Sequence, residues 1–247
     1  MKNWNKLIAF LALTLVISCG KDVSETLSTN PEFAQHIGAH TSGIISKKDK
    51  IQIQLTESLV GFDIEVPLKS NPFSFEPSIS GKTEWVDSRT LVFTPSEDLR
   101  ANTEYIANFD LASLKDVPKD IANFVFSFRT IQQNFDLSIT GSKTPNESDF
   151  TSMLVNGRVS FADIVDSNEL KKGISAYQNG SELSVNFFPV SSKEYRYVVT
   201  GVKRQKQNSE VTIKANADAF QAPTNKEEKL TIYGLDQFVV ANVKVVQ

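Results

Sequence analysis

Residues 73–81, Phe-Ser-Phe-Glu-Pro-Ser-Ile-Ser-Gly, begin the stretch of sequence that decides the fold. Short apolar runs recur here, around Trp85 and over residues 91–93, which predicts short strands that each bury one face. Pro77 and Gly81 mark the turn that follows the first strand. The apolar residues of the stretch are expected to form the core of a small β-sandwich: Phe73, Phe75, Ile79, Trp85, Leu91, Phe93, Leu99 and Tyr105.

Further strands are expected on both sides of this stretch. Apolar and polar residues alternate over residues 51–55 and 62–66 before it, and over residues 105–109 and 124–128 after it. Regularly spaced strands with turn residues between them are typical of an immunoglobulin-like sandwich, although a partly open barrel gives the same alternation. We therefore expect an all-β, immunoglobulin-like first domain over residues 43–131.

A second antiparallel β-sandwich is expected over residues 134–247. Its strand patterns are interrupted by a short helix, for which Asp166 or Ser167 is the expected cap. The dipeptide Asn-Gly at residues 179–180 predicts a tight β-hairpin turn. Residues 238–246 are expected to form its last strand. The fold class predicted for the chain is all-β, with two tandem immunoglobulin-like sandwiches.

The N-terminus has the pattern of a lipoprotein signal peptide over residues 1–18. Lys2 and Lys6 precede an apolar run over residues 7–17, which is too short to span a bilayer. The following Cys19 is preceded by Val-Ile-Ser, which resembles the bacterial lipobox, so Cys19 is the expected lipidation site and membrane anchor. It is the only cysteine in the chain, which argues against a disulfide. An ordinary secretory signal is the alternative.

Residues 19–42 are expected to form the lipidated N-terminus and a flexible tether, since they are polar and lack a sustained period. The sequence Gly-Lys-Asp at residues 20–22 resembles the export signal of surface lipoproteins in the Bacteroidetes. The expected localisation is therefore the outer membrane, with the lipid-anchored protein on either the periplasmic face or the cell surface.

Few residues have the spacing of a metal or catalytic site. His36 and His40 could share a helix face with Glu32 one turn earlier, but Gly38 and Gly43 disfavour a helix there. We expect no metal and no cofactor.

Two carboxylate pairs are the strongest catalytic candidates in the sequence. Asp163 with Asp166, and Glu227 with Glu228, could perform acid–base chemistry, but such pairs in loops are usually solvated turns or helix caps. We expect no catalytic residue and no enzyme, with a hydrolase as the weakest alternative. Because the formal net charge is −3, no nucleic-acid partner is expected.

Exposed aromatic residues could instead bind a glycan. Tyr195 and Tyr197 alternate at strand spacing, which favours a place in the core, and Tyr233 ends a later strand pattern.

The first domain resembles a known family in the spacing of its turn and core residues. These residues are Phe75, Pro77, Gly81, Trp85, Leu91, Phe93, Pro95, Leu99, Thr103 and Tyr105. They are similar to the first macroglobulin domain of bacterial alpha-2-macroglobulin-like proteins, although generic bacterial Ig-like modules share the pattern. Residues 163–166, 170–173 and 179–180 look like the next macroglobulin domain, and many bacterial members are lipoproteins.

The resemblance implies a function in endopeptidase inhibition by protease trapping at the cell envelope. It also implies that the chain is the N-terminal portion of a longer protein, with proteases or further macroglobulin domains as partners. The chain lacks the Cys-x-Glu-Gln thioester motif of many family members, so it is expected to be non-catalytic and unable to trap covalently by itself. The alternative is a two-domain Ig-like surface lipoprotein that acts as a binding or adhesion module.

Overall fold

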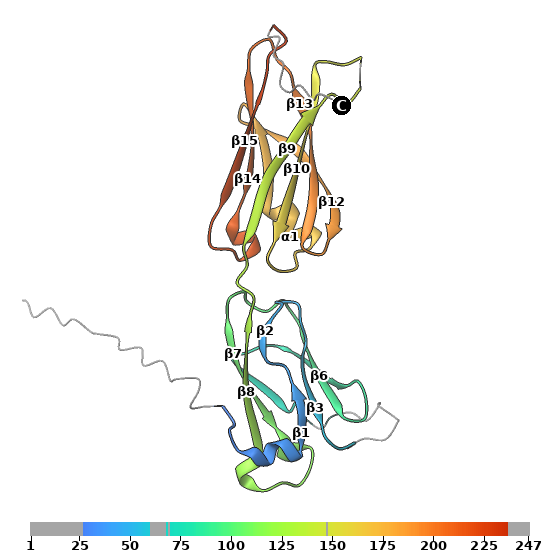
Figure 1. The fold of residues 1–247 in the computed structure, drawn as a ribbon, viewed down its shortest axis with the longest axis vertical. Coiled ribbons are helices and arrows are strands. Elements are labelled where there is room, and N and C mark those ends of the chain that lie inside the picture. The colour runs from blue at the N-terminus through green and yellow to red at the C-terminus, as the bar shows by residue number, and fades with distance from the viewer. Residues whose placement is uncertain (1–26, 60–67, 69, 147, 237–247) are drawn as a thin grey trace, which may run out of the picture.

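The computed structural model describes residues 27–59, 68, 70–146 and 148–236 of the 247-residue chain. Two β-sandwiches lie end to end, one up to residue 130 and the other from residue 135 (Figure 1). The all-β class predicted from the sequence is confirmed. Cys19 and the strands expected over residues 62–66 and 238–246 lie outside the described residues.

The first sandwich contains eight strands and three short 3₁₀ helices within the described residues. The strands are β1 (Ile37–His40), β2 (Gly43–Ile45), β3 (Ile51–Leu55), β4 (Phe73–Glu76), β5 (Gly81–Trp85), β6 (Thr90–Pro95), β7 (Glu104–Asp110) and β8 (Asn123–Thr130). The 3₁₀ helices are η2 (Pro31–Gln35), η3 (Leu111–Ser113) and η4 (Lys119–Ile121). The strands in the opening stretch form where the alternation of the sequence predicts them.

The strand order identifies the immunoglobulin topology. One sheet has the order β1-β3-β6-β5 and the other has the order β2-β8-β7-β4. These orders correspond to the ABED and GFC sheets of a constant-type immunoglobulin sandwich, with the first strand divided between the two sheets. The second half of the divided strand, β2, pairs in parallel with β8, and Gly43 lies opposite Phe128.

Tyr105 forms a second immunoglobulin feature at the start of β7. Its side chain is buried, and its hydroxyl accepts a hydrogen bond of 3.1 Å from the backbone nitrogen of Arg100. This bond to a residue shortly upstream of the tyrosine is the geometry of the tyrosine corner of immunoglobulin sandwiches. It ties the turn before β7 to the core.

The first domain begins earlier than the sequence predicted. Residues 19–42 were expected to form a tether, but Phe33 in η2 and Ile37 in β1 are buried in the core of the sandwich. The Phe33 ring packs on Phe124 with the centroids 5.1 Å apart. The spacing of Phe33 and Ile37 does not alternate as in a strand, which is why no element was predicted there.

The second sandwich has seven strands in the described residues, in the order β15-β14-β11-β12-β13-β10-β9. Its elements are β9 (Phe135–Lys143), β10 (Ser152–Phe161), α1 (Ser167–Gly173), β11 (Ile174–Gln178), β12 (Ser181–Ser191), β13 (Glu194–Lys203), β14 (Ser209–Ala215), η5 (Ala217–Phe220) and β15 (Lys226–Ile232). The long strand β12 joins the two layers. Its residues 181–183 pair with β11 and its residues 184–191 pair with β13.

Two local predictions in the second sandwich are confirmed. Asp166 caps α1 in a full capping box, because its side chain accepts from the first turn while the Glu169 side chain accepts from the Asp166 backbone nitrogen. Asn179 and Gly180 connect β11 and β12 with φ values of 51° and 80°. Positive φ at both positions is the requirement of a type I′ hairpin turn.

Trp85 provides a test of the first core. It is only 8% exposed, whereas the next residue, Val86, is 53% exposed. We expect Trp85→Ala to lower the free energy of unfolding by about 3–5 kcal/mol, because it removes a large buried ring and leaves a cavity. Chemical denaturation would measure this change. Val86→Ala is the matched control, and a Trp85→Ala protein as stable as this control would contradict the assignment of Trp85 to the core.

Candidate functional site

Polar side chains gather at the joint between the two sandwiches. Residues 131–134 form the whole connection from β8 to β9. Gln133 in this connection is completely buried, and its side-chain oxygen accepts a hydrogen bond of 2.9 Å from the backbone nitrogen of Asp163. The backbone of Ile131 donates to the carbonyl of Ile45 at 2.9 Å. The connection is therefore bonded to both sandwiches.

Lys47 is the centre of the joint. It lies in the turn between β2 and β3, and only 1% of its side chain is exposed. Its backbone nitrogen donates to Asp163 Oδ2 of the second sandwich at 2.7 Å, and its ammonium donates to Glu169 Oε1 in α1. Asp98 Oδ2 lies 3.8 Å from the same ammonium. A buried charge requires such partners, because burial removes it from water.

Lys48 extends this cluster towards the surface. Its ammonium lies 2.8 Å from Asp98, 3.5 Å from Asp166 and 3.9 Å from Glu169. Burial acts to lower the pKa of Lys48, but the Asp98 hydrogen bond and the charges of the three carboxylates outweigh it, so the pKa is raised. The joint thus pairs two lysines of the first sandwich with carboxylates from both sandwiches.

Of the two carboxylate pairs noted in the sequence, only Asp166 has the expected role. Asp163 was expected in a solvated turn, but it is only 1% exposed and bonds across the joint. Asp166 is a helix cap, as predicted. Glu227 and Glu228 lie on strand β15 rather than in a loop. No local pattern points to this role of Asp163, because its partner Lys47 is distant along the chain.

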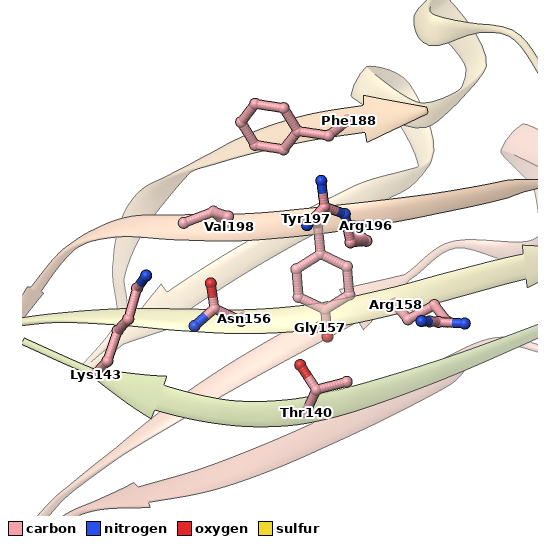
Figure 2. Close-up of a pocket in the computed structure, with 9 residues that line it drawn as sticks. All are labelled: Thr140, Lys143, Asn156, Gly157, Arg158, Phe188, Arg196, Tyr197 and Val198. Atoms are coloured by element: carbon pink, nitrogen blue, oxygen red, sulfur yellow. The ribbon is translucent and has the colours of Figure 1, made fainter. Parts of the chain in front are cut away.

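A groove of about 480 Å³ lies on the second sandwich, on the face formed by β12, β13, β10 and β9 (Figure 2). Three cationic side chains line it, together with one exposed aromatic ring. Its lining comprises Thr140, Lys143, Asn156, Gly157, Arg158, Phe188, Arg196, Tyr197 and Val198. Of these residues, the sequence pointed only to Tyr197, as a candidate for glycan binding or for the core. The others come from different strands, and the strand register brings them together.

Gly157 and Tyr197 form the floor of the groove. The Tyr197 ring lies across Gly157, and a β-carbon at that position would come within 2.1 Å of the ring (Figure 2). The Tyr197 hydroxyl donates to the carbonyl of Ser138 at 2.9 Å, and burial raises its pKa. Tyr195 and Tyr197 are both core residues, as predicted, whereas Tyr233 is exposed.

The two histidines make structural contacts within the first sandwich. The His40 ring packs on Phe126 with the centroids 4.9 Å apart, and His36 Nδ1 lies 3.3 Å from the Lys115 ammonium. Within the described ranges, no three His, Cys, Asp or Glu residues lie close enough together to hold a metal ion. In the same ranges, no helix has the length and apolar character needed to cross a membrane.

Comparison with known proteins supports the immunoglobulin topology of the first sandwich. Residues 28–130 match the family model Big_5, described as the bacterial Ig-like domain. This part of the chain is a bacterial Ig-like domain. The match includes residues 28–42, in agreement with the early start of the sandwich. A search of curated proteins found no match.

Solved structures give only distant similarities. An L,D-transpeptidase from Mycobacterium tuberculosis H37Rv is 11% identical, with 67% of this chain and 76% of that chain covered and a TM-score of 0.29. Bovine butyrophilin is 11% identical, with coverages of 80% and 94% and a TM-score of 0.31. L,D-transpeptidase 3 of M. tuberculosis with a faropenem-derived adduct is 13% identical, with 40% of this chain and 39% of that chain covered and a TM-score of 0.28. This chain thus spans well under half of that last protein, and these similarities carry no conclusion about function.

Removing the negative charge from the buried ion pair of the joint should destabilise the protein. Glu169→Gln keeps an acceptor for the helix cap but leaves the buried Lys47 ammonium with Asp98 alone, at 3.8 Å. We expect a loss of about 3 kcal/mol in the free energy of unfolding, measured by chemical denaturation, because a buried charge loses its partner. Adding Lys47→Met should recover part of this loss, since it removes the charge.

Asp136→Asn is the matched control for this experiment. It removes the exposed pair between Asp136 and Lys226, whose charged atoms are 3.0 Å apart, and we expect a change below about 1 kcal/mol. If Glu169→Gln had no larger effect than this control, the ion pair of Lys47 and Glu169 would not hold the joint.

The joint should also respond to acid. The pKa of Asp166 is lowered from 3.8, chiefly because the Glu169 backbone nitrogen donates to it, with help from Asn168 and Lys48 that together outweigh burial. Its contribution to stability is therefore complete above pH 3.8 and is lost as the pH falls through the lower, folded-state value. The raised pKa of Lys48 places the loss of its contribution above pH 10.5.

We therefore expect the arrangement of the two sandwiches to be constant from about pH 5 to 9, and to loosen below pH 3.8 and above pH 10.5. Small-angle X-ray scattering across this range would measure the change as an increase in the radius of gyration. A radius of gyration that changes between about pH 5 and 9 would contradict this expectation.

Proposed function

We propose that the chain is a non-catalytic, two-domain module of the bacterial cell envelope. It holds a binding surface in a fixed orientation, and Cys19 attaches it to the outer membrane through a lipid. The observation that carries the proposal is the joint, where the buried Lys47 pairs with Glu169 across the two sandwiches. A flexible pair of independent domains would not need a buried interdomain ion pair, whose burial costs desolvation energy.

The bonding of the connection supports a fixed orientation as well. Besides Lys47 and Gln133, the backbone nitrogen of Ala101 donates to Gln221 Oε1 of the second sandwich at 2.8 Å. Three separate segments of the first domain therefore contact the second domain: the turn at residues 47–48, the loop at residue 101 and the connection itself. Contacts at several points restrict bending in more than one direction.

Distance measurements between spin labels would test this proposal. Lys82 in β5 and Ser184 in β12 are exposed, so Lys82→Cys and Ser184→Cys can carry the labels in a Cys19→Ser background. We expect a single narrow distance distribution, because the joint fixes the two domains. The distribution should broaden when Glu169→Gln is added and stay narrow when Asp136→Asn is added. A broad distribution in the labelled parent protein would overturn the proposal.

The lipid anchor has its own test. Growth with an alkyne fatty acid should label the protein expressed in its bacterial host, and Cys19→Ser should abolish the label. Fractionation would then show whether the protein is in the outer membrane. Retention of the label in Cys19→Ser would exclude Cys19 as the anchor.

A second candidate function is endopeptidase inhibition, as the N-terminal portion of an alpha-2-macroglobulin-like lipoprotein. The observation in its favour is the direct succession of two β-sandwiches, the first of which is a bacterial Ig-like domain. An antibody against this chain would test it by immunoblotting of the native host. A product far larger than 27.4 kDa is expected if further macroglobulin domains follow, and a product of that mass alone would contradict this candidate.

A further inference from the structure

Two arginines face each other on the groove of the second sandwich. The register of β10 and β13 places Arg158 directly opposite Arg196. Like charges directly opposite each other destabilise a sheet, so the fold itself gains nothing from this pair. Glu194 bonds Arg158 at 2.5 Å, and within the described residues Arg196 has no ion pair. The one carboxylate that pairs with these two guanidinium groups thus pairs with Arg158 alone.

The neighbouring side chains add positive charge and apolar surface. Lys143 of β9 also lines the groove (Figure 2). Phe188 lies opposite Arg196 on β12 and is 45% exposed. Val190, further along β12, is 53% exposed. The face therefore combines unbalanced cations with apolar side chains at one end, in a chain whose overall charge is negative.

The strand at this end of the groove is a sheet edge. Residues 184–191 of β12 pair with β13, while the pairing of β12 with β11 covers only residues 181–183. In the described part of the chain, residues 184–191 therefore have a strand on one side only. An extended segment could lie along this edge with its side chains over the groove. Pro189 would interrupt the ladder there, since proline has no backbone donor.

We propose, building on the binding module proposed above, that this groove binds an extended acidic segment of a partner protein. Carboxylates of the segment pair with Arg196, Arg158 and Lys143, and an apolar side chain of the segment packs on Phe188. A peptide fits this surface better than an anionic glycan does. Arginine and exposed aromatic side chains are enriched at protein interfaces, and the valine side chains offer a sugar neither stacking nor hydrogen bonds.

Fluorescence polarisation with the full chain carrying Cys19→Ser would test the proposal. The probes are a labelled peptide of alternating Glu and Leu, the same peptide with Lys in place of Glu, and a labelled oligomer of galacturonic acid. We expect the acidic peptide to bind, with an affinity that falls as salt is raised, and the basic peptide not to bind. Binding of the uronic acid oligomer without the acidic peptide would overturn the proposal in favour of a glycan.

Arg196→Gln is the decisive variant. It should weaken binding of the acidic peptide about tenfold, the effect of losing one charge-assisted hydrogen bond. The matched control is Arg89→Gln, an exposed arginine in the turn between β5 and β6, which should leave binding unchanged. Because Arg196→Gln also removes the repulsion from Arg158, its melting temperature should be no lower than that of the parent protein.

The two proposals can fail separately. Absence of acidic peptide binding, or equal binding by the Arg196→Gln protein, would overturn the peptide site. Neither result would alter the distances between the spin labels, which test the fixed joint. Conversely, a flexible joint would leave the groove intact, because every residue of the groove belongs to the second sandwich.

Discussion

The arrangement of this protein depends on one buried charge. The Lys47 ammonium belongs to the first sandwich, but one of its two carboxylate partners, Glu169, belongs to the second. A charge removed from water is tolerated only with such partners. The second sandwich therefore supplies a carboxylate that the buried lysine of the first sandwich requires. The Lys47 backbone is held in the same way, because its nitrogen donates to the buried Asp163. Ion pairs and hydrogen bonds therefore hold the two domains in a defined relation.

Glu169 connects this joint to the local folding of the second domain. One of its oxygens accepts from the Asp166 backbone and completes the capping box, while the other accepts from Lys47. The start of α1 and the pairing of the domains thus use the same carboxylate. The tight connection over residues 131–134 restricts how far the partners can separate, which lowers the entropic cost of bringing them together.

The sequence predicted the parts of the fold that depend on local patterns. Alternation identified the strands around Trp85 and Tyr105, and a polar residue followed by Glu169 limited the helix cap to Asp166 or Ser167, of which the structure shows Asp166. It did not reveal η2 and β1, because Phe33 and Ile37 bury themselves without alternating. It also failed at Asp163 and Arg196, whose surroundings come from strand register and from residues far away in the chain. Features set by neighbouring residues could be predicted from the sequence, whereas the burial of a polar group could not, because it depends on the tertiary structure.

The parallel pairing of β2 with β8 has a mechanical consequence. The chain enters the first sandwich through β1 and β2 and leaves it through β8, and β2 and β8 run in the same direction. Tension between the two ends of this domain would slide these strands along each other, so that their hydrogen bonds are loaded together in shear. Strands that peel apart break such bonds one after another at lower force. A domain with this geometry is suited to a position where the chain is pulled from both ends.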